Sequence, residues 1–231
     1  MKILIGNKRY SSWSLRPWLV LKHFNIPFEE QLIFLGQGDI REHVQSLACV
    51  SAGKVPCLID NQRDNVVWDS LAIIEYIADQ YRNLPIWPTD ASARAHARSA
   101  SCEMHSGFAA LRKECPMNLS KRYAQRDRGD GVTEDVKRIT SIWRAARDAF
   151  GSKTSAPFLY GDFSAADAMF APVVTRLHTY SIEVDEQSQA YVDAVMALPA
   201  FQAWRNAALL EDMIIDRSEF DEPILERYTS F

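Results

Sequence analysis

Residues 2–82 alternate between short apolar runs, typical of strands, and apolar positions that recur at helical spacing. The run at residues 2–6 is continuous and β-branched, as in a strand covered on both faces. Residues 28–35 are mixed in polarity, which places that strand nearer a sheet edge. The expected order is strand 2–6, a helix from Ser14, strand 28–35, a weak helix 40–47, a strand ending at Asp60, strand 66–68, and a helix capped by Asp69 and Ser70.

Two helix starts carry recognisable cap residues. Ser14 is a good N-cap for the first helix, and Pro17 then falls in the first turn, where a missing N–H costs nothing. Ser164 and Asp167 have the spacing of a capping box, so they predict a helix running toward His178 and a structural role for both residues.

Beyond a proline-bounded segment at residues 83–88, the strand pattern disappears. Apolar residues then recur at steps of 4, 3, 4, 4 and 3 along one helix face: Ala93, Ala97, Ala100, Met104, Phe108 and Leu111. Further helices are expected at 134–150, from Ser164, at 187–197 and at 201–210, before a polar, irregular tail after Met213. We therefore predict an α/β domain at 1–82, a linker at 83–91 and an all-helical domain at 92–231.

Composition and charge exclude several classes of protein. The chain has 231 residues, 47% hydrophobic and 24% charged, an ordinary balance for globular domains. Its net charge of −4 and the lack of a basic run give no support to a nucleic-acid or membrane partner. The apolar start is too short for a signal peptide, and no segment reaches the roughly 20 apolar residues of a membrane span.

The cysteines and histidines do not have the spacing of a metal or redox site. The four cysteines form no CxxC pair, and the five histidines are scattered along the chain. Cys49 and Cys57 are expected to be small core residues. We therefore expect reduced thiols, no metal and a cytoplasmic protein.

Four local sequences resemble those of the glutathione transferase family and follow that family's order. They are Tyr10–Arg16, Lys54–Pro56, Asp69–Ile77 and Gly161–Asp167. The resemblance implies a thioredoxin-like α/β N-terminal domain that binds glutathione as co-substrate, joined to an all-α helical bundle. The serine-rich loop and the run Ser-Leu-Ala-Ile-Ile-Glu-Tyr are most similar to the zeta class, which includes maleylacetoacetate isomerases.

The loop at residues 10–14 has the chemistry to activate a thiol. A thiol with a pKa of about 8.5 is mostly protonated at neutral pH, so an enzyme must stabilise its thiolate. The loop supplies several hydroxyls and leads into the positive end of a helix. Matching to the zeta class favours Ser11 as the catalytic residue, whereas counting back from Arg16, as in theta-class relatives, favours Ser12.

Tyr10 is the weaker hydroxyl candidate and is expected to be a packing residue with a satisfied hydroxyl. We count Tyr10 and Trp13 with the glutathione-binding residues. In zeta-class members this loop is similar to Ser-Ser-Cys, and Trp13 stands at the position of that cysteine. The absent cysteine weakens the isomerase interpretation and argues against thiol-transferase chemistry.

The remaining glutathione contacts follow from the resemblance. It implies a cis Val55–Pro56 bond, with the Val55 backbone pairing with the cysteinyl part of glutathione, and Lys54 within reach of the glycyl carboxylate. Ser70 and the N–H groups of its helix start suit the γ-glutamyl carboxylate. Asp69 is expected to face the γ-glutamyl amine, although helix capping alone also explains it.

The second substrate is less constrained. Met104, His105 and Phe108 either line the electrophile pocket or form an ordinary core stripe. Our first hypothesis is conjugation of glutathione to a small hydrophobic electrophile, in a homodimer as the family implies. The alternatives are a maleylacetoacetate-type cis–trans isomerase and a non-catalytic relative that binds partners.

Overall fold

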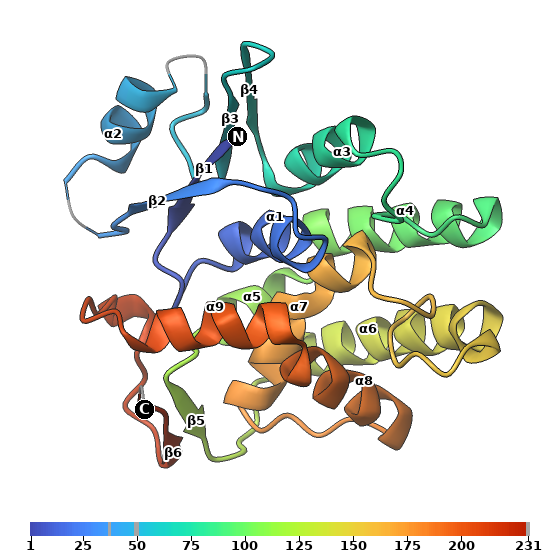
Figure 1. Ribbon diagram of the computed structural model, residues 1–231. Coiled ribbons are helices and arrows are strands. Elements are labelled where there is room, and N and C mark those ends of the chain that lie inside the picture. The colour runs from blue at the N-terminus through green and yellow to red at the C-terminus, as the bar shows by residue number, and fades with distance from the viewer. Residues whose placement is uncertain (37, 49–50, 230–231) are drawn as a thin grey trace.

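The computed structural model describes residues 1–36, 38–48 and 51–229. An α/β part comes first and a helical part follows, with α1 between the sheet and the C-terminal helices (Figure 1). The α/β part consists of β1 (Lys2–Gly6), α1 (Ser12–His23), β2 (Glu29–Ile33), α2 (Ile40–Leu47), β3 (Cys57–Asp60), β4 (Asn65–Trp68) and α3 (Ser70–Gln80).

The described residues of the α/β part form a four-stranded sheet in the order β2-β1-β3-β4. β1 pairs in parallel with β2 and antiparallel with β3. The expected edge position of the second strand is confirmed, and so is the expected burial of the first, since residues 3–6 of β1 are all buried. Alternate residues of β1 serve opposite faces, because Ile3 and Ile5 pack with α1 and α3 whereas Leu4 packs with Val44 of α2.

The start of α1 differs from the prediction. The helix begins at Ser12 with Ser11 as its N-cap, two residues before the expected start, and Pro17 lies in its interior. Ser14 instead uses its hydroxyl to accept a hydrogen bond from the Gly6 N–H at 3.0 Å. This bond ties the first turn of α1 to the end of β1.

The helical part begins with α4 (Ala91–Ser106) and α5 (Ala109–Glu114). The predicted single apolar face is confirmed, since all six of its residues are buried. The helix itself breaks, because α4 ends before Gly107 and Phe108 has a φ of 56°. The chain continues through α6 (Asp130–Ala149), η1 (Gly151–Lys153), α7 (Ala165–Thr179), α8 (Glu186–Ala197), α9 (Pro199–Leu209) and η2 (Asp216–Ser218).

The tail is more regular than the sequence suggests. β6 (Ile224–Arg227) pairs antiparallel with β5 (Lys121–Tyr123), so the helical part carries a two-stranded ribbon where only helices were expected. The tail was expected to be irregular, and that expectation was wrong. Both strands are short, and neither has an alternating pattern long enough to be recognised alone.

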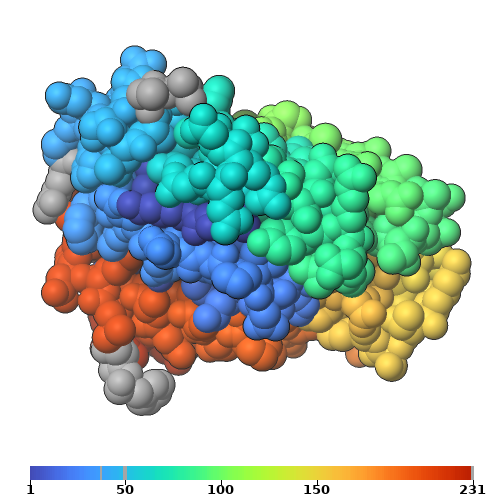
Figure 2. Space-filling view, turned by 45° about the horizontal axis from the view of Figure 1, so that its top comes forward, coloured from blue at the N-terminus to red at the C-terminus, as the bar shows by residue number. Residues whose placement is uncertain are grey.

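The α/β part and the helical part pack closely along a broad front (Figure 2). The Trp204 indole N–H of α9 donates to the Lys8 carbonyl at 2.8 Å, and α7 packs against α1. At the other end of the interface, the Arg98 guanidinium of α4 pairs with both carboxylate oxygens of Glu75 in α3. The loop after β1 is therefore fixed by both parts of the molecule.

Candidate active site

Two adjoining cavities lie where the loop after β1 meets the segments around residues 54 and 70. The larger has a volume of about 970 Å³ and the smaller about 480 Å³, and Trp13, Lys54 and Val55 line both. The larger cavity also takes in residues of the helical part, including Arg112, and a volume of this order holds a molecule of drug size.

The structure separates the two serines of the loop by their hydrogen bonds. Ser11 is 6% exposed; its hydroxyl donates to the Ser14 hydroxyl at 2.8 Å and accepts from the Ser14 N–H at 3.4 Å. Ser12 is half-buried at the first position of α1 and, like Ser11, lines the larger cavity. Within the described part of the chain, its hydroxyl has no hydrogen-bond partner, so it is available to a ligand.

Tyr10 lines the larger cavity, but its hydroxyl is committed elsewhere. It donates to Glu219 Oε1 at 2.6 Å. Burial and this bond raise the pKa of Tyr10 to about 12. The expectation of a buried tyrosine with a satisfied hydroxyl is met.

The C-terminal segment holds the loop in place. The Glu211 carboxylate accepts hydrogen bonds from the backbone N–H groups of Lys8 and Arg9, at 2.6 and 3.1 Å. Burial raises the pKa of Glu211, although these bonds partly offset the effect. Sequence reasoning missed Glu211 and Glu219, which act from about two hundred residues further along the chain.

The segment Lys54–Pro56 borders the same two cavities. The Val55–Pro56 bond is cis, as the resemblance implies. Val55 is half-buried and lines both cavities, while Lys54 is exposed at their shared edge. Pro56 is buried beside Val55 and lines the smaller cavity.

The start of α3 completes the smaller cavity. Asp69 caps this helix by accepting from the Leu71 and Ala72 N–H groups, in a backbone conformation (φ 75°) that non-glycine residues rarely adopt. Ser70 lines the cavity and is 1% exposed, yet its hydroxyl has no partner in the described part of the chain. A buried hydroxyl at a helix N-terminus, without a partner, fits a bound carboxylate.

Of the three residues suggested for the electrophile pocket, two lie in the core and one lines a cavity. Met104 and Phe108 are 0% and 7% exposed, belong to the core, and line neither cavity. His105 does line the smaller cavity, where its Nε2 lies 3.3 Å from Asp69 Oδ2 and its ring meets Trp13 edge-on.

Sequence reasoning also missed the arginines of the larger cavity. Arg41, Arg112, Arg176 and Arg217 line it. A signal was present for Arg176, which interrupts an otherwise largely apolar helix. Nothing in the local sequence distinguished the other three from ordinary surface arginines.

The possible metal ligands and thiols of the described residues lie apart from one another or are buried. Among residues 1–36, 38–48 and 51–229, no cluster of histidine, cysteine or acidic side chains is placed to hold a metal ion. The thiols of Cys57 and Cys115 are buried, and burial raises the pKa of each to about 11. Cys57 is thus the core residue expected, and Cys49 lies outside the described residues. The described helices include none long and apolar enough to cross a membrane.

Comparisons with known families match both parts of the chain. Residues 10–80 match the family model of the glutathione S-transferase N-terminal domain, and residues 123–207 match that of the C-terminal domain. A probable maleylacetoacetate isomerase of Caenorhabditis elegans is 26% identical over 175 residues, 75% of this chain and 77% of that protein. Glutathione S-transferase GstB of Escherichia coli K12 is 33% identical over 79 residues, 34% of this chain and 38% of that protein.

Solved structures share the fold. A glutathione transferase homolog from a Burkholderia strain, BGR1, with bound glutathione superposes with a TM-score of 0.65 at 22% identity, over 90% of this chain and 96% of that one. A sphingomonad glutathione S-transferase complexed with glutathione gives 0.62 at 20% identity, over 91% and 100%. The predicted fold, a thioredoxin-like domain followed by a helical domain, is confirmed.

Proposed function

This chain belongs to the glutathione S-transferase family, and from that premise we propose that it binds glutathione in the smaller cavity and activates its thiol beside Ser12. The bound thiolate attacks a small electrophile in the larger cavity. A sulfur–carbon bond forms as the leaving group departs with its electron pair, and the thiol proton passes to solvent. No covalent bond to the protein is needed.

The observation that carries this proposal is the pair of uncommitted hydroxyls on adjoining cavities. Ser70 has a buried hydroxyl without a partner in the smaller cavity, and Ser12 has a free hydroxyl in the larger one. In the proposed pose, Ser70 and the α3 N-terminus hold the γ-glutamyl carboxylate, and Asp69 faces the amine. Lys54 takes the glycyl carboxylate, and the Val55 backbone pairs with the cysteinyl unit.

The sulfur then lies at the start of α1. The Ser12 hydroxyl donates a hydrogen bond to it, and the positive end of the helix favours its charge. Both effects lower the pKa of the thiol, because both stabilise the thiolate and not the thiol. Ser11 contributes by capping the helix, and Trp13 closes the site between the two cavities.

We also place the protein in the cytoplasm, as a homodimer, in keeping with its family. The nematode relative's name supports one alternative, glutathione-assisted isomerisation of a maleylacetoacetate-type substrate, in which the thiolate adds and leaves again. Trp13 in place of a cysteine favours conjugation.

Turnover of an aryl chloride, 1-chloro-2,4-dinitrobenzene, tests the proposal. Ser12→Ala should lower kcat on the order of a hundredfold, since it removes the donor to the developing charge. Ser11→Ala, corrected for its stability, should keep most of the activity. Equal losses in both variants would contradict the assignment to Ser12.

The choice of substrate tests the alternative functions. Faster turnover of maleylacetoacetate than of the aryl chloride would favour the isomerase, and glutathione binding without any turnover would favour a non-catalytic relative.

A further inference from the structure

The C-terminal side of the larger cavity is lined by arginines without a carboxylate partner. They are Arg112 of α5, Arg176 of α7 and Arg217 of η2, and none of them forms an ion pair within the described part of the chain. Among the described residues of this lining, the one carboxylate belongs to Asp39, which caps α2 through backbone N–H groups. The cavity wall therefore carries a strong excess of positive charge on this side.

Arg176 is the most deeply buried of the three, at 4% exposure. Its Nε donates to the Cys115 carbonyl at 2.9 Å and its Nη1 to the Pro172 carbonyl at 3.0 Å, and both acceptors are neutral. Burial lowers the pKa of Arg176 to about 10, which leaves it charged at neutral pH. A buried charge held only by neutral acceptors is costly, and an anion in the cavity would offset that cost.

Arg112 and one further arginine, Arg16, gather around Trp13. The guanidinium groups of Arg16 and Arg112 lie 4.2 and 5.6 Å from the centre of the Trp13 ring. Arg16 is 1% exposed, and its Nη1 has no partner among the described residues. Burial, followed by repulsion from Arg176 and Arg112, lowers the pKa of Arg16 to about 9. The positive charges thus reinforce one another beside the cavity.

Glutathione does not account for these arginines. Its two carboxylates are assigned above to Ser70 and Lys54, which both belong to the α/β part. Arg112 and Arg176 come from the helical part and contact only the larger of the two cavities. Their charge is therefore available to the second substrate, and guanidinium forks bind carboxylates with matching geometry.

We propose that the electrophile carries a carboxylate, which Arg112 and Arg176 bind, while exposed Arg217 at the cavity rim attracts it from solution. The inference rests on the proposed function and changes the expected electrophile from a hydrophobic molecule to an anionic one. Trp13 stands where zeta-class relatives have a cysteine. Its ring lies beside the Arg112 guanidinium and positions it.

Two glutathione conjugates that differ only in charge test the inference by calorimetry: S-(4-carboxybenzyl)glutathione and its neutral amide, S-(4-carbamoylbenzyl)glutathione. The wild type should bind the carboxylate conjugate about tenfold or more tightly than the amide conjugate. A charge-assisted hydrogen bond changes a dissociation constant by about this factor. Arg112→Gln and Arg176→Gln should each remove most of that preference. Arg176 is buried, so Arg176→Gln could fail to fold. Arg112 is only half-buried, and Arg112→Gln then still tests the inference.

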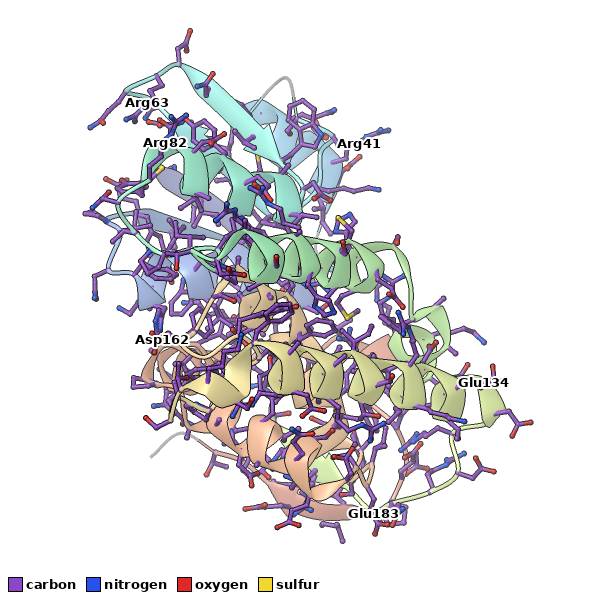
Figure 3. The ribbon with its side chains drawn as sticks, turned by 90° about the vertical axis from the view of Figure 1, so that its right-hand side faces the viewer. Arg41, Arg63, Arg82, Glu134, Asp162 and Glu183 are labelled. Carbon is purple, nitrogen blue, oxygen red and sulfur yellow. The ribbon has the colours of Figure 1, made fainter. Side chains whose placement is uncertain are left out.

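Arg82→Gln is the matched control. Arg82 is exposed next to α3, on the opposite side of the α/β part from Arg41 in Figure 3, and lines neither cavity. It should leave the preference unchanged.

Two outcomes overturn this inference, and a third contradicts the proposed function. Equal affinity of the wild type for both conjugates overturns this inference and leaves the proposed function intact. An equal loss of affinity for glutathione and both conjugates in Arg112→Gln also overturns it, because the arginine would then serve glutathione. Failure of glutathione itself to bind the wild type instead contradicts the proposed function.

Discussion

At the residue scale, the clearest mark of a ligand is the Ser70 hydroxyl. It is buried at the N-terminus of α3, yet no described residue hydrogen-bonds to it. Leaving a buried hydroxyl unpaired costs roughly 1–3 kcal/mol, which a bound carboxylate recovers. Asp69 beside it holds an unusual backbone conformation, and such conformations gather at ligand sites.

Ser70→Ala should therefore weaken glutathione binding about tenfold, measured as Kd by calorimetry, because the hydrogen bond goes to a charged carboxylate. The folded protein should be as stable as the wild type or slightly more so. Ser101→Ala is the matched control, since Ser101 also has a buried hydroxyl without a described partner but lies in α4 and lines neither cavity. An unchanged Kd in Ser70→Ala would remove Ser70 from the site.

Residue identity alone could not separate Ser11 from Ser12. Each is small and hydroxylated, and each suits either a helix cap or a thiolate donor. The distinction depends on where α1 begins, and that depends on Ser14, whose hydroxyl bonds to the end of β1. A contact between two elements therefore decides which serine is free.

At the element scale, α7 is the helix on which the C-terminal part depends. It is buried along nearly its whole length and starts at the predicted Ser164. The Asp167 carboxylate accepts from the Ser164 N–H at 2.9 Å and from the Leu159 N–H at 3.1 Å. Burial raises the pKa of Asp167 to about 6, so the group is mostly ionised at neutral pH.

Asp167→Ala should lower the free energy of unfolding at neutral pH by about 2 kcal/mol or more, because it strands buried donors. Chemical denaturation measures this change. Asp162→Ala, at an exposed position just before the helix, should change stability by less than about 0.5 kcal/mol. Equal small effects in both variants would contradict the structural role of the capping box.

The sequence predicted elements well where their signal is local. The order of strands and helices in the α/β part and the start of α7 depend on runs and caps within a few residues. The break at Gly107 was missed because the apolar face continues across it. The β5–β6 ribbon was missed because its pairing joins residues about one hundred positions apart.

At the scale of the whole molecule, the C-terminal segment holds the loop that follows β1. Glu211 holds the loop's backbone, and Glu219 accepts hydrogen bonds from Tyr10 and Asn118 and pairs with Lys121. Although burial raises the pKa of Glu219, these partners lower it overall. The arginines of the larger cavity come from distant segments of the chain and meet only in the folded molecule, so the sequence did not reveal them.

Glu219→Gln should destabilise the protein by about 1–2 kcal/mol at neutral pH. The lowered pKa means that ionised Glu219 stabilises the fold above its unfolded pKa of about 4.3, and that this contribution is lost as the pH falls through the still lower folded pKa. The difference between wild type and variant, followed by thermal unfolding, should therefore shrink on acidification. Exposed Glu183→Gln should show no such difference (Figure 3). A difference that grows in acid would contradict this assignment.

The most direct test of the account is an ultraviolet titration of the thiolate of bound glutathione. The wild type should hold the thiol with a pKa at least one unit below its free value of about 8.5, Ser12→Ala should return it close to that value, and Ser11→Ala should leave it low. A bound thiol that titrates like free glutathione in the wild type, or a low pKa that survives in Ser12→Ala, would contradict the central claim that Ser12 activates glutathione.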